Sequence, residues 1–185
     1  MQKLKIGFLS LYQTDLADSF VGTLLITDSY GIPLEFKCTH AVKATAIQKA
    51  LYGERLKPYI GIELCGVPLL DSITNYPSVI FIDLQYFIAI RSKIDAPVIL
   101  INKAIDEIKN KPEDELLETE NKIFIEHEYE SFEPIVIQSH PDFKKDVTDF
   151  LEQIKAVFNN FDLLEPFARM QKSVEILGKS DSKFK

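Results

Sequence analysis

SVIFIDLQYFIAIRSKIDAPVILIN, residues 78–102, is the stretch of this sequence that decides the fold. It contains two apolar runs, 79–82 and 97–101, of the kind found in strands that are buried on both faces. Between the runs, apolar side chains recur at helical spacing. A short crossover of this kind joins parallel strands and is right-handed. The stretch therefore predicts a strand–helix–strand unit at the centre of a sheet.

More strands and a helix are expected before this unit. Residues 4–12, 21–27 and 32–39 are apolar or alternating runs, and turn residues such as Gly31 separate them, which predicts a three-stranded meander. A helix is expected to begin near Ala44 or Thr45. Its buried side should carry apolar residues, and proline should end or kink it: Ile47, Ala50, Leu51 and Leu56 form the expected stripe, and Pro58 the expected break.

The C-terminal part predicts two helices. Apolar side chains follow a period of about 3.6 residues from Phe143 to Phe161, and again from Leu163 to Leu177. The first stripe is too apolar to face water, so it should cover the sheet or another chain. The expected fold class is α/β or α+β: a mixed sheet with a central strand–helix–strand unit, an N-terminal three-stranded meander and a C-terminal helix pair.

Composition favours one soluble domain. The chain has 185 residues, of which 46% are hydrophobic, so we expect a single domain over 1–178 and a disordered tail over 179–185. The most apolar stretch, 79–90, is interrupted by Asp83 and is shorter than the roughly 20 residues of a membrane-spanning helix. Cys38 and Cys65 show no metal or redox spacing. With no signal peptide recognisable, these features predict a cytoplasmic protein.

The charge is negative and uneven. The net charge is −7, and residues 106–133 hold eleven acids against three lysines. An acidic protein repels a phosphate backbone. Neither sequence-independent nucleic-acid binding nor membrane binding is therefore expected.

The order of expected elements is similar to the ribonuclease H-like fold over roughly residues 4–102. That resemblance implies carboxylates grouped around divalent metals: one from the first strand, one from the first helix and one at the end of the fourth strand. Asp83 closes the fourth strand, and Glu54 or Glu63 would come from the helical region. The first strand contains no acid. The resemblance thus points to a chain without that nuclease activity.

Asp83 and Asp28 each allow two interpretations. Asp83 is interpreted first as a cap of the following helix. Alternatively, it lines a ligand crevice together with Asn102, because ligands of open sheets bind beyond the carboxyl ends of the strands. Asp28 is interpreted first as a turn residue that bonds its own backbone, and alternatively as a metal ligand beside Asp83.

One segment has the composition of a docking surface. Residues 44–70 mix Tyr52, Tyr59 and Arg55 with further bases, glycines and a proline. Tyr and Arg are enriched where proteins contact partners. The alternative is that the segment only wraps over the sheet and both rings are core.

Two functions of different class follow. The first is a non-catalytic cytoplasmic binding or adaptor protein without a cofactor, acting through a protein partner or as a homo-oligomer, because no catalytic triad, phosphate loop or zinc motif is recognisable. Its binding residues would be Tyr52, Arg55, Tyr59 and Asn102. The alternative is a metal-dependent phosphoesterase or nuclease with a reduced carboxylate set and Mg²⁺ or Mn²⁺. It would use Asp83 with Asp28, Glu54 or Glu63. The sequence leans towards a protein that is not an enzyme.

Overall fold

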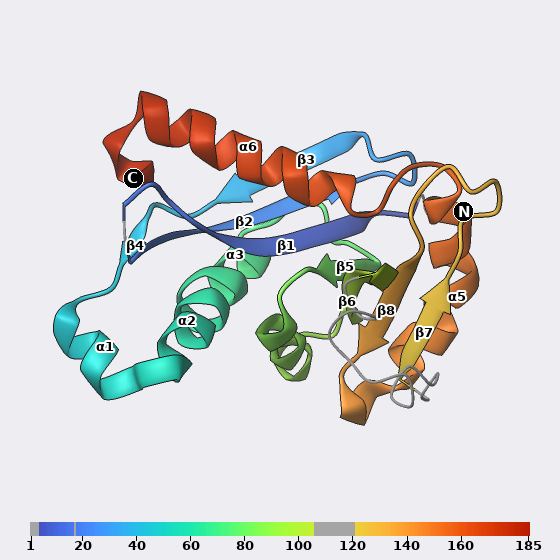
Figure 1. The fold of residues 1–185 in the computed structure, drawn as a ribbon, viewed down its shortest axis with the longest axis horizontal. Coiled ribbons are helices and arrows are strands. Elements are labelled where there is room, and N and C mark those ends of the chain that lie inside the picture. The colour runs from blue at the N-terminus through green and yellow to red at the C-terminus, as the bar shows by residue number, and fades with distance from the viewer. Residues whose placement is uncertain (1–3, 17, 106–120) are drawn as a thin grey trace.

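The computed structural model describes residues 4–16, 18–105 and 121–185. In this part of the chain one mixed sheet lies between two helical layers (Figure 1). The strands follow the order β3-β2-β1-β5-β6-β8-β7, and β4 pairs with β2. The bounds are β1 Ile6–Gln13, β2 Ser19–Thr27, β3 Pro33–Cys38, β4 Val42–Lys43, β5 Val79–Ile82, β6 Val98–Lys103, β7 Lys122–Ile125 and β8 Ile135–Ser139.

The predicted central unit is confirmed. Strands β1, β5 and β6 are parallel neighbours, and β5 and β6 are buried along their apolar runs. The crossover between β5 and β6 is a 3₁₀ segment, Gln85–Lys93, and not the expected α-helix. Phe87 and Ile90 are both buried, and their spacing of three residues matches the period of a 3₁₀ helix.

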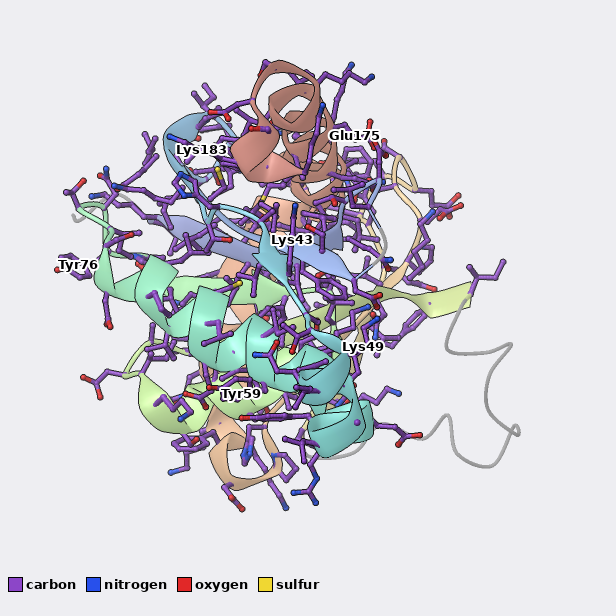
Figure 2. All side chains as sticks on the ribbon, turned by 90° about the vertical axis from the view of Figure 1, so that its left-hand side faces the viewer. Lys43, Lys49, Tyr59, Tyr76, Glu175 and Lys183 are labelled. Carbon is purple, nitrogen blue, oxygen red and sulfur yellow. The ribbon has the colours of Figure 1, made fainter. Side chains whose placement is uncertain are left out.

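The carboxyl ends of β1, β5 and β6 meet at one end of the sheet, which we call the carboxyl edge. The segment that follows β1 is joined there to the start of the first helix, because the Ala44 backbone N–H donates to the Asp18 carbonyl and Lys49 pairs with the Asp18 carboxylate. Figure 2 looks onto this end of the molecule, where Lys43 and Lys49 are labelled.

A broken run of helices covers one face of the sheet. It comprises α1 Ala46–Tyr52, a 3₁₀ turn Gly53–Arg55, α2 Leu56–Tyr59, a π-helical segment Ile60–Gly66 and α3 Val67–Asp71. Pro58 does not end the run. It is the third residue of α2, in the first turn of that helix, where a missing backbone donor is tolerated.

The buried stripe expected for α1 is wrong. Ile47 and Leu51 are 72% and 78% exposed, and α1 buries no residue. A capping box between Thr45 and Gln48 holds its first turn instead. Helix α1 lies beyond the end of the sheet (Figure 1), so its apolar side chains meet no strand. Burial against the strands begins only at Leu56.

The C-terminal helices, α5 Lys145–Phe158 and α6 Glu165–Ser180, cover the other face, as predicted. Phe158 and Phe167 pack there with Phe8 and Phe81 of the sheet. The chain beyond α6 forms a 3₁₀ turn, Ser182–Phe184, where a disordered tail was expected. The ring of Phe184 lies against His40, and the Ser19 hydroxyl donates to the Lys185 carbonyl.

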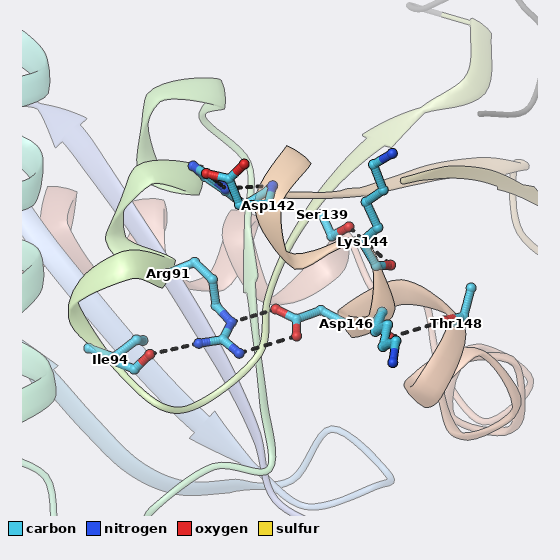
Figure 3. Close-up of polar contacts among 9 residues, drawn as sticks. Arg91, Ile94, Ser139, Asp142, Lys144, Asp146 and Thr148 are labelled. Atoms are coloured by element: carbon cyan, nitrogen blue, oxygen red, sulfur yellow. Dashed lines mark hydrogen bonds and ion pairs between the residues drawn. The ribbon is translucent and has the colours of Figure 1, made fainter. Parts of the chain in front are cut away.

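An ion pair fastens the crossover to α5 (Figure 3). Arg91 donates from Nε and Nη2 to the two carboxylate oxygens of Asp146, at 2.5 and 3.3 Å, and from Nη1 to the Ile94 carbonyl. Its guanidinium also lies 4.1 Å from the centre of the Phe143 ring. These contacts join elements on opposite faces of the sheet.

No helix in the described ranges is both long enough and apolar enough to cross a lipid bilayer.

Candidate functional site

Asp83 and Ser10 form a side-chain pair at the carboxyl edge. The parallel register places Leu9 beside Ile82, so the next residues of β1 and β5 are neighbours. Strand alternation directs both side chains to the face that α5 and α6 cover. The Ser10 hydroxyl donates to Asp83 Oδ1 at 2.7 Å. The start of the 3₁₀ crossover carries no side-chain cap, so Asp83 does not have the capping role given to it first.

The surroundings of Asp83 favour its neutral form. Burial raises the pKa of Asp83 to about 6, although the Ser10 hydrogen bond and the positive charge of Lys57 oppose this effect. Burial, and then the negative charge of Asp83, raise the pKa values of Tyr12 and Tyr86. Both hydroxyls therefore remain protonated. The Tyr12 hydroxyl donates to the Phe167 carbonyl at 2.7 Å.

The other predicted acids do not join Asp83. Asp28 lies in the turn after β2, and Thr27 pairs with Ile6, so Asp28 is at the opposite end of β1 from Ser10. Its carboxylate accepts hydrogen bonds from the backbone N–H groups of Tyr30 and Ile32, as a turn residue does.

The two glutamates of the helical run also point elsewhere. Glu63 is exposed and pairs with Lys93 at 2.9 Å, and Glu54 is exposed in the 3₁₀ turn before α2. Over the described ranges, no three His, Cys, Asp or Glu side chains come together as a metal site would require. A two-metal centre, in which neighbouring ions share carboxylates, does not fit these residues.

Asn102 lies at the same edge as Asp83 but not on the same face. Ile82 pairs with Leu100, so Asn102 is one position further along β6 than the neighbour of Asp83. Side chains alternate along a strand. The Asn102 side chain therefore points to the face covered by α1 to α3.

Tyr52, which is exposed, and Tyr59, which is half-buried, form an aromatic pair beside the edge. Their ring centres lie 4.9 Å apart with a tilt of 37°. Tyr52 is 40% exposed, so the interpretation of both rings as core is wrong. Arg55 and Lys57 are exposed between them, and Lys57 is near enough to Asp83 to lower its pKa. Lys43, Lys49 and Tyr59 are labelled on this end of the molecule in Figure 2.

Sequence reasoning missed Ser10 and Tyr12. The residue type expected from the first strand was an acid, and a serine inside an apolar run carries no signal of its own. Once Asp83 is placed at the end of β5, the parallel pairing identifies its neighbour on β1. That register was the missing information.

Comparison with known proteins identifies the fold. No protein family and no curated protein matches the sequence. Among solved structures, the endonuclease V of Ciona intestinalis, in complex with a DNA containing an inosine followed by a ribo-adenosine, is similar with a TM-score of 0.53 and 11% identity, over 93% of this chain and 87% of that chain. A point variant of the same enzyme with a similar DNA gives a TM-score of 0.51 and 12% identity, over 94% and 88%.

The fold is thus a mixed α/β fold of the ribonuclease H-like nuclease type, as in endonuclease V, and the resemblance seen in the order of elements is confirmed. The comparison overturns the non-catalytic adaptor function, because the fold is similar to that of a nuclease over almost the whole chain. It also overturns the exclusion of nucleic acid, since the similar enzyme is bound to DNA. Net charge alone does not exclude nucleic acid, because it averages over the whole surface and a local basic face can differ from it in sign.

Proposed function

We propose that this chain is a nucleic-acid-binding phosphoesterase or nuclease with a reduced carboxylate set, and that its site is Asp83 with Ser10 at the carboxyl edge. One observation carries the proposal. In a nuclease-type fold, the carboxylate that closes β5 lies directly beside the first strand, where such a site is expected.

The aromatic pair supplies a surface for nucleic acid. Bases of every kind stack on aromatic rings, and lysine and arginine neutralise the phosphates between them. Tyr52 and Tyr59 offer such rings, and Arg55 and Lys57 are exposed beside them. Lys57 lies near enough to Asp83 for its positive charge to lower the pKa of that carboxyl, so an oligonucleotide bound along these residues would lie close to the carboxylate.

The donor set suits one metal ion. Mg²⁺ keeps several waters and is usually bound through one or two carboxylates together with substrate phosphates. Asp83 would be the protein ligand, with Ser10 orienting its carboxylate by the hydrogen bond at 2.7 Å. An ion held there would supply positive charge to neutralise the phosphodiester. Because the pKa of Asp83 is about 6, the carboxylate is ionised, and so able to bind a cation, only above that pH.

The binding claim is tested by fluorescence anisotropy with labelled single-stranded DNA and RNA. Each stacked base contributes about 1–3 kcal/mol, so changing both Tyr52 and Tyr59 to Ala should weaken binding at least tenfold. Tyr76→Ala is the matched control, because Tyr76 is 75% exposed on the chain before β5. Absence of binding by the unmodified chain, or equal losses in test and control, would overturn the proposed surface.

Hydrolysis is tested with the same oligonucleotides in the presence of Mg²⁺ or Mn²⁺. Cleavage should rise as the pH passes through about 6 and should be lost in Asp83→Asn, while oligonucleotide binding is kept. If the unmodified chain binds but never cleaves, the nuclease part of the proposal is wrong.

We also propose a cytoplasmic location. Cys38 and Cys65 are both free thiols, as is usual in a reducing compartment.

A further inference from the structure

A cavity of about 410 Å³ opens between the end of β1, the last turns of α6 and the 3₁₀ turn that follows α6. Its volume falls within the range of roughly 300–1,000 Å³ that is typical of small-molecule sites. Aromatic, aliphatic, polar and charged residues line it, and among them are Leu11, Val174 and the cationic Lys185. The rings are Tyr12 and Phe184, and the polar groups include Gln13, Asp15, Gln171 and Glu175.

The two carboxylates of this cavity are strong hydrogen-bond acceptors. Glu175 is held by Gln171, one turn earlier on α6, whose Nε2 donates to Glu175 Oε1 at 3.3 Å. The Asp15 carboxylate makes no hydrogen bond or ion pair with the described part of the chain. An ionised carboxylate only accepts hydrogen bonds, and it does so best from two parallel N–H donors. The ligand should therefore be flat and should present such a pair.

We infer that this cavity binds a guanine base. Guanine carries a ring N–H next to an exocyclic amino group, so its edge offers two neighbouring donors to one carboxylate. Adenine and cytosine place an acceptor nitrogen beside the amino group, and that nitrogen repels a carboxylate. The rings of Tyr12 and Phe184 provide apolar walls for the base.

Tyr12 connects this cavity to the site described above. It lines the cavity, and it also lies near enough to Ser10 and Asp83 to interact with both. A nucleotide bound in the cavity would therefore lie beside the Asp83 site at the carboxyl edge. This continuity favours a nucleotide over a cationic side chain, and in this respect the inference rests on the proposed function.

The test is a titration of the full chain with guanosine, inosine and adenosine monophosphates. Binding is measured by calorimetry or by ligand-observed NMR. Inosine lacks the exocyclic amino group, so its nucleotide should bind about tenfold more weakly than that of guanosine. Adenosine monophosphate should bind at least as weakly as inosine monophosphate. N-acetylarginine serves as a probe for the competing cationic ligand.

Glu175→Gln should remove the preference for guanine. Glu152→Gln makes the same change of charge at an exposed residue of α5 and should leave the preference intact. The inference would be overturned if the three nucleotides bound equally well or if N-acetylarginine bound more tightly than they do. It would also be overturned if no nucleotide bound while oligonucleotides still did. Guanine preference without oligonucleotide binding would instead uphold the cavity and overturn the proposed function.

Discussion

Asp83 is a carboxylate that lowers the stability of the fold when it is ionised. Its pKa rises from the ordinary value of 3.8 to about 6 because it is buried. An acid whose folded pKa is raised stabilises the fold below its unfolded pKa, and that contribution is lost as the pH rises through the folded pKa. The relevant window is therefore about pH 4 to 6. A buried group whose pKa is strongly shifted in this way is typical of functional sites.

Asp83→Asn should therefore stabilise the protein at neutral and higher pH. Asparagine stays neutral and still accepts the Ser10 hydrogen bond. One pKa unit corresponds to about 1.4 kcal/mol. In urea unfolding, the stability of the variant relative to the unmodified protein should therefore be higher at pH 8 than at pH 4 by about 1–3 kcal/mol. A difference between the two proteins that does not change with pH would contradict the assignment of a raised pKa to Asp83.

Glu35 behaves in the opposite way. Desolvation acts to raise its pKa, but hydrogen bonds from the backbone and side chains of Asn75 and Thr74 outweigh it and lower the pKa to about 2. The carboxylate thereby ties the edge strand β3 to the chain before β5. The stabilisation is present above the ordinary pKa of 4.5 and is lost as the pH falls towards 2.

Glu35→Gln should lower the melting temperature at pH 7. The difference from the unmodified protein should shrink as the pH is lowered from about 4.5 to 2, since the Glu35 carboxylate then becomes protonated. Glu152→Gln, a change at a more exposed glutamate, is the control and should have little effect on the melting temperature. If the difference in melting temperature stayed constant across this pH range, the carboxylate charge would not be what holds β3 to the chain before β5.

At the scale of elements, β2 and the π-helical segment Ile60–Gly66 pack against each other at Gly22. A Cβ added at Gly22 would overlap the Cβ of Cys65. Gly22→Ala should therefore destabilise the protein by about 1–3 kcal/mol in urea unfolding, the usual cost of overpacking. Adding Cys65→Ala should not rescue it, because alanine keeps the overlapping Cβ, whereas adding Cys65→Gly should. Full rescue by Cys65→Ala would contradict this packing.

The ion pair between Arg91 and Asp146 links the crossover to α5. Both side chains are largely buried, at 14% and 10% exposure. Removing one partner of a buried pair leaves an uncompensated charge, so Arg91→Ala should destabilise the protein by about 3–5 kcal/mol in urea unfolding. The double variant Arg91→Met, Asp146→Leu should recover most of that loss. If the double variant loses as much unfolding free energy as the two single variants together, the two side chains do not interact energetically across the contact that Figure 3 shows.

At the scale of the whole molecule, the sheet could be predicted because its signal is local. The runs 79–82 and 97–101 have no polar face, so they fit few positions other than the centre of a parallel sheet. The stripes of α5 and α6 have one apolar face each, and that face meets the sheet. The character of the crossover and the exposure of α1 escaped prediction, because both depend on where each segment lies relative to the ends of the strands.

The site was less accessible to sequence reasoning than the fold. Asp83 was identified because it ends a strand, but Ser10 is 73 residues away in the chain and is brought to it only by strand pairing. The same limit applies to the cavity that joins Asp15 to Glu175. The adaptor function was inferred from missing motifs, which exclude particular mechanisms but leave a fold's class of function open.

The central claim is that nucleic acid binds over the carboxyl edge. Amide hydrogen exchange of the full chain, measured with and without a single-stranded oligonucleotide, tests it most directly. We expect slower exchange in the segments that hold Ser10, Tyr59 and Asp83, and unchanged exchange in β7 and β8. Protection confined to β7 and β8, or no protection at a saturating oligonucleotide concentration, would contradict the account.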